Sequence, residues 1–362
     1  MAPSRGGASS ARKGTGGSKK SMKNAKQEKV MVSSKSDIPL ELQQRTLDIF
    51  KATFRNELST DVSATLQKIK QHLYNREFSL AFGCEEYLRV YCARWSPSRA
   101  LGYLQVLSET VQDHLDLEQD DVEKRSEDGA NASFKKLVRA TCLGAGGGAE
   151  IAGFVAHLQQ INSSVSDEKK SRLDLTIVDI ADWSPIVRSL RETITQPPNL
   201  SAYTSGALKA NNVAFAAPES FACRFHQSDL LQMDFAQLQR LLQAVDLVTL
   251  MFTLNELYST SLAQTQRFLL QLGNCLKAGA LFLVVDSPGN YSTIQLNGKE
   301  KRYPMQWLLD HTLLPDPALG SNERTWEKLV SDESRWFRLP EGLKYPIALE
   351  NMRYQIHLYR KL

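Results

Sequence analysis

An apolar segment that runs directly into a cluster of glycines constrains the fold of this chain more than any other feature. The residues from Cys142 to Glu150 read Cys-Leu-Gly-Ala-Gly-Gly-Gly-Ala-Glu, and an apolar helical pattern follows over Ile151 to Ile161. A strand that turns so sharply into a helix needs glycine, since a side chain would block the turn and keep a ligand away from the helix N-terminus. Glycine clusters also occur as plain turns, so the surrounding pattern must decide whether this one binds a nucleotide-type ligand.

Strand and helix patterns alternate along the rest of the chain. The first predicted strand is Phe134 to Leu143, and the next four are Leu173 to Asp179, Phe221 to Gln227, Asp246 to Phe252 and Leu281 to Val285. Such alternation is typical of an α/β fold with a parallel, doubly wound sheet. Ligands bind to these sheets beyond the carboxyl ends of the strands. The polar residues that the sequence places there are Asp179, Asp229, Asn255, Glu256 and Asp286.

The glycine spacing by itself permits two kinds of cofactor. Gly144, Gly146 and Ala149 satisfy the spacing of a dinucleotide-binding loop, and Asp179 suits the ribose hydroxyls of any adenosine ligand. Two segments favour a different cofactor. Leu276 to Val285 resembles the turn into the fifth strand of S-adenosylmethionine-dependent methyltransferases, and Met352 to Tyr359 alternates like a half-exposed antiparallel strand, which ends the sheet in that family. A nicotinamide-dependent oxidoreductase remains the alternative.

The chain as a whole resembles the fungal 25S ribosomal RNA uridine-N3 methyltransferases over roughly residues 37 to 362. Four segments carry the resemblance: Arg94 to Leu101, Cys142 to Glu150, Leu250 to Leu257 and Tyr303 to Asp310. It implies a class I, Rossmann-like α/β fold with a seven-stranded, mostly parallel sheet whose last strand is antiparallel. It also implies S-adenosyl-L-methionine as cofactor and N3 of a uridine in 25S ribosomal RNA, free or in a pre-60S particle, as substrate. A second alternative is a ribosome-assembly factor with an idle cofactor fold.

The resemblance to these methyltransferases implies functions for the residues at the strand ends. Those expected to contact the cofactor are Gly144, Ala145, Gly146, Glu150, Asp179, Ile180, Asp229 and Leu230. Glu256 is expected to accept the proton of uridine N3, and Asn255 to bind a uracil carbonyl or the methionine part of the cofactor. Both residues are also favoured in the first turn of a helix, and Asp229 alternatively caps a helix that begins near Leu230.

Positive charge is concentrated at the N-terminus. Residues 1–36 contain nine Lys or Arg and one acid, whereas the whole chain has a net charge of +4. With so few apolar residues, this basic tail is expected to be disordered, to bind phosphates and to direct the protein to the nucleolus or nucleus, the cytoplasm being an additional location. A merely solubilising tail is the alternative. Further RNA contacts are expected from Lys299, Lys301, Arg302, Arg94 and Arg99, although charge runs are commonly solvated faces and Trp95-Ser96-Pro97 also suits a structural joint.

The remaining segments complete the predicted organisation. Residues 37–115 are expected to form a helical module with a helix that starts at Ser96-Pro97, residues 116–132 an acidic linker, and residues 133–362 the methyltransferase domain. No apolar span approaches the ~20 residues needed to cross a bilayer. No membrane segment is therefore expected. The five cysteines show no metal-binding spacing, so no zinc site is expected either. The protein is expected to be a monomer.

Overall fold

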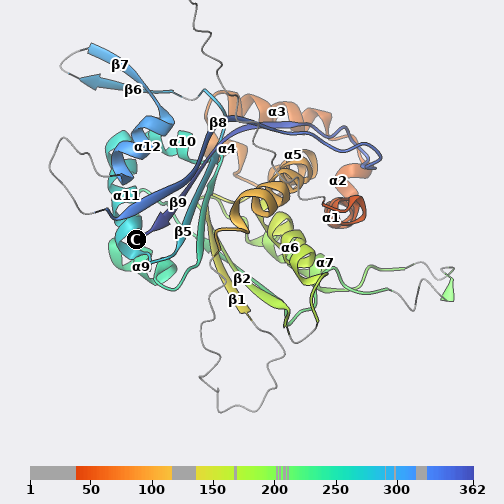
Figure 1. The fold of residues 1–362 in the computed structure, drawn as a ribbon. Coiled ribbons are helices and arrows are strands. Elements are labelled where there is room, and N and C mark those ends of the chain that lie inside the picture. Colours follow the sequence, from red (N-terminus) through yellow and green to blue (C-terminus); the bar gives the residue numbers. More distant parts are fainter. Residues whose placement is uncertain are drawn as a thin grey trace, which may run out of the picture. The chain divides into compact units, whose positions relative to one another are not determined.

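A seven-stranded sheet with two antiparallel strands at one edge organises this structure, which is a computed structural model (Figure 1). The structure describes residues 38–115, 136–166, 169–200, 203, 205–206, 209, 212–289, 291–296, 299–314 and 324–362. The predicted basic tail over residues 1–36 and the predicted acidic linker over residues 116–132 lie outside the described residues. Within the described part of the chain, no helix is long and apolar enough to cross a membrane.

The strand order is β3-β2-β1-β4-β5-β9-β8. The parallel strands are β1 (Lys136–Leu143), β2 (Ser171–Asp179), β3 (Phe221–Gln227), β4 (Leu247–Met251) and β5 (Leu281–Asp286). The last strand, β9 (Met352–Lys361), is antiparallel to β5 and to the edge strand β8 (Trp326–Phe337). The predicted mostly parallel sheet with an antiparallel last strand is confirmed. The chain leaves β1 toward β2 on one side, and β4 lies on the other, so the carboxyl ends of β1 and β4 flank the crevice where such sheets bind ligands.

Helices cover both faces of the sheet (Figure 1). One face packs against α6 (Ala149–Asn162) and α7 (Ser184–Thr195), and the other against α9 (Phe235–Leu242), α10 (Leu254–Thr260), α11 (Leu262–Cys275) and α12 (Met305–Leu313). This double cover explains why every residue of β4 and β5 is buried and why both strands have nearly continuous apolar sequences. A hairpin of β6 (Tyr291–Leu296) and β7 (Lys299–Pro304) connects β5 to α12.

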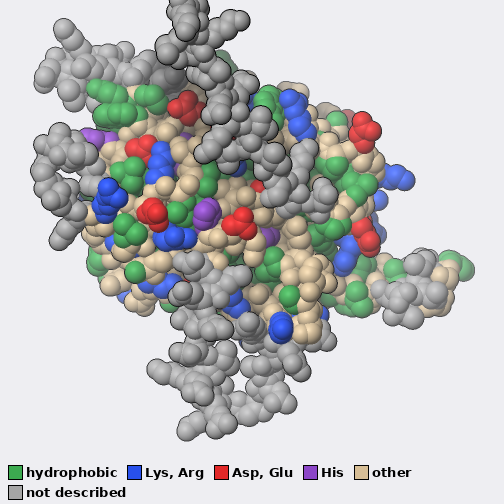
Figure 2. All heavy atoms as spheres, viewed as in Figure 1, with side chains coloured by type: hydrophobic (Ala, Val, Ile, Leu, Met, Phe, Trp, Pro, Cys, Tyr) green, Lys and Arg blue, Asp and Glu red, His purple; other side chains and the backbone are tan. Residues whose placement is uncertain are grey.

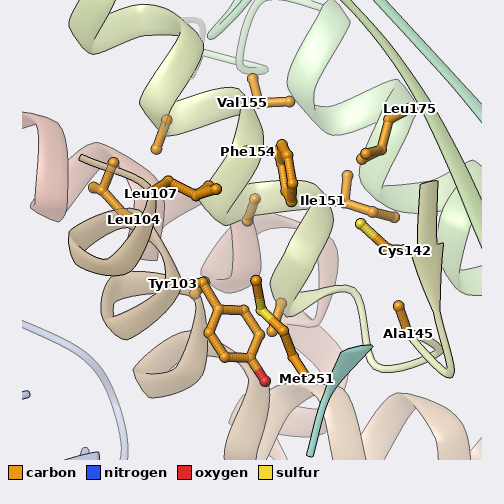
Figure 3. Close-up of a cluster of buried hydrophobic side chains, with 14 of the residues drawn as sticks. Tyr103, Leu104, Leu107, Cys142, Ala145, Ile151, Phe154, Val155, Leu175 and Met251 are labelled. Atoms are coloured by element: carbon orange, nitrogen blue, oxygen red, sulfur yellow. The ribbon is translucent and has the colours of Figure 1, made fainter. Parts of the chain in front are cut away.

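The N-terminal helices share a hydrophobic core with the sheet. They are α1 (Leu40–Thr53), α2 (Arg55–Ser59), α3 (Ser63–Tyr74), α4 (Phe78–Ala81) and α5 (Glu85–Val106), and a π-helical turn follows at Leu107–Val111. Figure 3 shows Leu104 and Leu107 beside Phe154 of α6, and Tyr103 beside Met251 at the end of β4. The described residues therefore form one compact unit in which α5 is packed against α6.

The prediction that a helix starts at Ser96-Pro97 is wrong, because both residues lie inside α5. Proline has no N–H with which to bond the carbonyl of Ala93, four residues earlier in the helix. The hydroxyl of Tyr345, from the segment before β9, donates to this carbonyl at 3.1 Å. Ser96 Oγ donates to the carbonyl of Gly147 in the glycine loop. The motif is therefore a joint that ties α5 to two other parts of the fold.

We expect Tyr345→Phe to lower the free energy of unfolding by about 1–2 kcal/mol, because the buried carbonyl of Ala93 then loses its partner. Urea denaturation followed by circular dichroism measures this loss. Tyr74→Phe is the control, since the Tyr74 side chain is exposed. Equal stability of the two variants would contradict the assignment.

Candidate functional site

A cavity of about 1340 Å³ lies at the carboxyl ends of β1, β2, β3 and β4. The sheet side contributes Gly144, Gly146, Glu150, Asp179, Asp229 and Glu256. The facing wall comes from α3, α5 and the residues near α4, and includes Arg76, Tyr91, Trp95, Arg99 and Tyr103. The volume exceeds the 300–1,000 Å³ typical of a site for one small molecule. The cavity therefore has room for a cofactor and part of a second ligand.

The glycine loop leaves no space for side chains where it borders the cavity. Gly144 has φ +66°, and a Cβ built on it would lie 2.2 Å from Thr253. A Cβ on Gly146 would lie 1.8 Å from the indole nitrogen of Trp183. Thr253 Oγ1 also donates to the carbonyl of Gly144 at 3.0 Å. The loop is thus fixed between Thr253, which precedes α10, and Trp183, which precedes α7, and this is why glycine is required at both positions.

Asp179, the last residue of β2, presents a fixed carboxylate at the cavity wall. Its Oδ1 accepts hydrogen bonds from the Ala181 N–H at 2.9 Å and from Trp183 Nε1 at 3.1 Å. Burial raises the pKa of Asp179, and these hydrogen bonds offset part of the rise. Trp183 is 2% exposed and packs against Phe82, so the indole serves as a rigid support for the carboxylate.

The other predicted cofactor residues fall into two groups. Asp229, Leu230 and Ile180 line the cavity together with the loop glycines, whereas Ala145 is buried beneath the loop and does not line it. Asp229 Oδ1 accepts from the N–H of Leu231 at 2.9 Å and so stabilises a turn. The alternative, a helix that begins near Leu230, is wrong, because α9 begins five residues later behind its own capping box at Asp234.

A buried acid and a cation both line the cavity. Glu150, in the first turn of α6, is 5% exposed, and burial raises its pKa to about 7 although the charge of Arg99 lowers it somewhat. Arg99 Nη1 donates to the hydroxyl of Tyr91 at 2.7 Å, and its guanidinium carbon lies 5.1 Å from the centre of the Phe252 ring. The structure therefore places Arg99 inside the cavity. A carboxyl and a guanidinium so arranged suit a ligand that carries both charges.

Of the two predicted catalytic residues, Glu256 lies on the cavity wall and Asn255 does not. Glu256 Oε2 forms an ion pair with Arg76 Nη1 at 3.2 Å, which links α10 to the connection between α3 and α4. The backbone N–H of Asn255 donates to buried Asp286, and its side chain approaches Glu256 Oε1 at 3.4 Å. Asn255 thus contacts Asp286 and Glu256, and it does not line the cavity. Burial raises the pKa of Asp286 to about 6.

The predicted RNA-binding residues lie on two elements, α5 and β7. Arg94 forms an ion pair with Glu350, and Lys299, Lys301 and Arg302 lie on β7, where their side chains are outside the described part of the structure. No group of three or more His, Cys, Asp or Glu among the described residues could hold a metal ion.

Among the wall residues that sequence reasoning missed are Arg76, Tyr91 and Phe252. Phe252 could have been noticed, because it comes at the end of a strongly apolar segment. The structure shows that its φ is +57°, which is unusual for a side chain of this size. Arg76 and Tyr91 have no local signal, since only the packing of the N-terminal helices brings them to the cavity.

Comparison with known proteins relates the chain to one enzyme family. Residues 50–360 match the family described as "Putative SAM-dependent methyltransferase". The 25S rRNA (uridine(2843)-N(3))-methyltransferase of Saccharomyces cerevisiae is 30% identical over 351 residues, which are 91% of this chain and 88% of that protein.

Solved structures also align with the chain. A SAM-dependent methyltransferase from Methanosarcina mazei aligns with 62% of this chain and 92% of its own length, at 13% identity and a TM-score of 0.32. TrmN from Thermus thermophilus aligns with 63% of this chain and 45% of its own length, at 12% identity and a TM-score of 0.31.

We expect Glu150→Gln to change how stability depends on pH. Because the pKa is raised in the folded state, the folded protein holds a proton that the unfolded chain releases between about pH 4.3 and 7, so the wild type loses stability as pH rises through this window. When the pH rises from about 5 to about 8, the free energy of unfolding of the variant increases relative to that of wild type by at most about 3 kcal/mol. Urea unfolding at both pH values measures the gain.

Glu85→Gln is the control for this experiment, because Glu85 lies in the first turn of α5 with an exposed side chain. Parallel pH profiles for wild type and Glu150→Gln would show that the Glu150 carboxyl is not held in its protonated form.

Proposed function

Since this chain belongs to the family of S-adenosylmethionine-dependent methyltransferases, we propose that it methylates N3 of a uridine in large-subunit ribosomal RNA. The observation that carries the proposal is that one cavity is lined both by cofactor-type residues, Gly144 and Asp179, and by an acid, Glu256, that suits proton transfer. The yeast relative named for this reaction supports the choice of substrate. The match to this family leaves the nicotinamide alternative without support beyond the glycine spacing.

The lining of the cavity suits the parts of S-adenosylmethionine. In this proposal Asp179 accepts hydrogen bonds from the ribose hydroxyls and Asp229 from the adenine amino group, and both residues line the cavity. The amino-acid part has an ammonium and a carboxylate, for which the carboxyl of Glu150 and the guanidinium of Arg99 are the partners in the cavity lining. When bound, S-adenosylmethionine supplies a methyl group on a positively charged sulfur. The residues of this chain provide orientation and exclude water, which together account for much of the rate of such displacements.

Glu256 is the residue that we assign to proton transfer. Uridine N3 holds a proton between two carbonyls, so the proton must leave before or during attack on the methyl group. The carboxylate of Glu256 lines the cavity and accepts it, a contribution of typically 10²–10⁴-fold in rate. Asn255 acts here as a positioning residue, because its side-chain amide lies 3.4 Å from Glu256 Oε1. Arg76 holds the other carboxylate oxygen.

The substrate must present an unpaired base. Inside a duplex, N3 of uridine is engaged in base pairing, so the nucleotide has to be single-stranded or flipped out to enter the cavity. Residues 1–36, with nine Lys or Arg, add affinity for phosphates without sequence specificity. We place the protein in the nucleolus or nucleus, where ribosomal RNA or a pre-60S particle is the partner.

We expect Asp179→Asn to weaken binding of S-adenosylmethionine or its demethylated product about 10- to 100-fold, because the amide loses the charge that favours ribose hydroxyl donors. Isothermal titration calorimetry measures the affinity. The control is Asp174→Asn in the first half of β2, where the side chain pairs with exposed Arg224. Unchanged affinity in Asp179→Asn, with the fold intact by circular dichroism, would contradict the assignment.

Incubation of the protein with 25S ribosomal RNA and S-adenosylmethionine, followed by mass analysis of the nucleosides, tests the reaction itself. We expect 3-methyluridine from wild type and a rate lower by about 10²–10⁴-fold from Glu256→Gln, because the amide cannot accept the proton. Glu219→Gln, an exposed acid outside the cavity, is the control. A wild type that binds the cofactor and the RNA but leaves every nucleoside mass unchanged would select the idle assembly factor.

A further inference from the structure

An exposed tryptophan with two arginines lies at the end of β8, outside the main cavity. Trp336 is 47% exposed. The guanidinium carbon of Arg338 lies 4.1 Å from its ring centre, and that of Arg353 lies 5.8 Å away. Trp336 and Arg353 are paired directly across β8 and β9. We refer to these three residues as the Trp336 patch.

The Trp336 patch lies on the same side of the sheet as the cavity, where the parallel strands have their carboxyl ends. Because β9 runs antiparallel to β5, its first residues lie next to the carboxyl end of β5, where Gln355 is opposite Asp286. A smaller cavity of about 190 Å³ is lined by Arg353 together with Trp95, Arg99 and Phe252. The last three residues also line the main cavity. A continuous lined surface therefore leads from the patch to the candidate active site.

The charge of the patch is available to a ligand. Among the described residues, no carboxylate forms an ion pair with Arg338 or Arg353, and Arg353 Nε donates to the hydroxyl of Ser334 at 3.0 Å. The neighbouring Arg335 differs, since it pairs with Asp332. Figure 2 shows basic and acidic side chains interspersed over the described part of the face in view, so local clusters of this kind matter more than the overall charge.

Planar cations beside an indole suit one kind of occupant. Unpaired nucleic-acid bases stack on aromatic rings and on guanidinium planes, and the adjacent phosphates are attracted to the arginine charge. A neutral protein surface would gain from the indole but would leave both guanidinium charges without an anionic partner. A nucleic-acid segment satisfies both properties of the patch.

We propose that the Trp336 patch binds the single-stranded RNA that adjoins the methylated uridine. One nucleotide stacks on the patch while the target base reaches the main cavity along the surface lined by Arg353, Arg99 and Phe252. The inference rests on the proposed function for the identity of the RNA. It goes further by assigning a separate binding site to residues that take no part in the reaction.

Fluorescence anisotropy of the full chain with a labelled, uridine-rich single-stranded RNA tests the inference. We expect Trp336→Ala to weaken binding about 5- to 100-fold, the range for removal of one stacked base, and Trp336→Phe to retain most of the affinity. The double variant Arg338→Gln/Arg353→Gln should also reduce the salt dependence of binding, by a slope of about 0.7 for each phosphate that the protein no longer neutralises. Calorimetry should show unchanged affinity for the demethylated cofactor in every variant, and thermal unfolding should show an intact fold.

Arg224→Gln is the matched control, because Arg224 is an exposed arginine on β3 at the opposite edge of the sheet. Patch variants that bind RNA as tightly as wild type, or a wild type that binds no single-stranded RNA, would overturn the inference. Methylation distinguishes the two proposals. If wild type methylates uridine and the patch variants bind RNA normally, only the inference about the patch is contradicted. If wild type binds RNA through the patch but forms no 3-methyluridine, the patch is supported and the proposed function is contradicted.

Discussion

The contact between α5 and the glycine loop is the interaction on which the candidate site depends. The carbonyl of Gly147 accepts hydrogen bonds from Ser96 Oγ and Cys92 Sγ of α5. A Cβ on Gly147 would lie only 3.0 Å from the ring of Tyr91, so the helix and the loop are as close as the backbone allows. This contact places one wall of the cavity on the N-terminal helices and brings Arg99 opposite the strand ends. Without α5, the crevice of the sheet would be an open edge.

Burial also sets the electrostatics in and near the cavity. Three acids, Glu150, Asp179 and Asp286, have pKa values raised by burial. Keeping such acids beside a cavity costs stability, and perturbed acids in a cleft are typical of functional sites. A ligand that carries positive charge stabilises their ionised forms. A sulfonium cofactor with an ammonium group is such a ligand, so the cost of burying these acids is offset when the site is in use.

The accuracy of the sequence predictions followed the distribution of burial. The bounds of the parallel strands and of β9 were predicted to within a few residues, because buried strands have continuous or alternating apolar patterns. The prediction that β9 is half-exposed is wrong, because all residues from Tyr354 to Tyr359 are buried. The edge strand β8 was missed, since much of it is exposed and its sequence is rich in charged residues. The hairpin of β6 and β7 was also missed. It forms a separate two-stranded sheet, so it does not share the apolar pattern of the strands in the main sheet. Ser96-Pro97 was misread as a helix start, because the bond that replaces the missing N–H comes from Tyr345, about 250 residues away in the sequence.

The sequence by itself determined the sheet, the glycine turn and the carboxylates at the strand ends, because each follows from local periodicity or from the steric limits of a short segment. Only the tertiary structure decided which of these residues share a cavity, that Arg76 pairs with Glu256, and that Arg353 pairs across two strands with Trp336. These contacts join residues far apart along the chain, and no local pattern encodes them. They arise when the N-terminal helices pack against α6 and when β8 and β9 join the sheet beside β5.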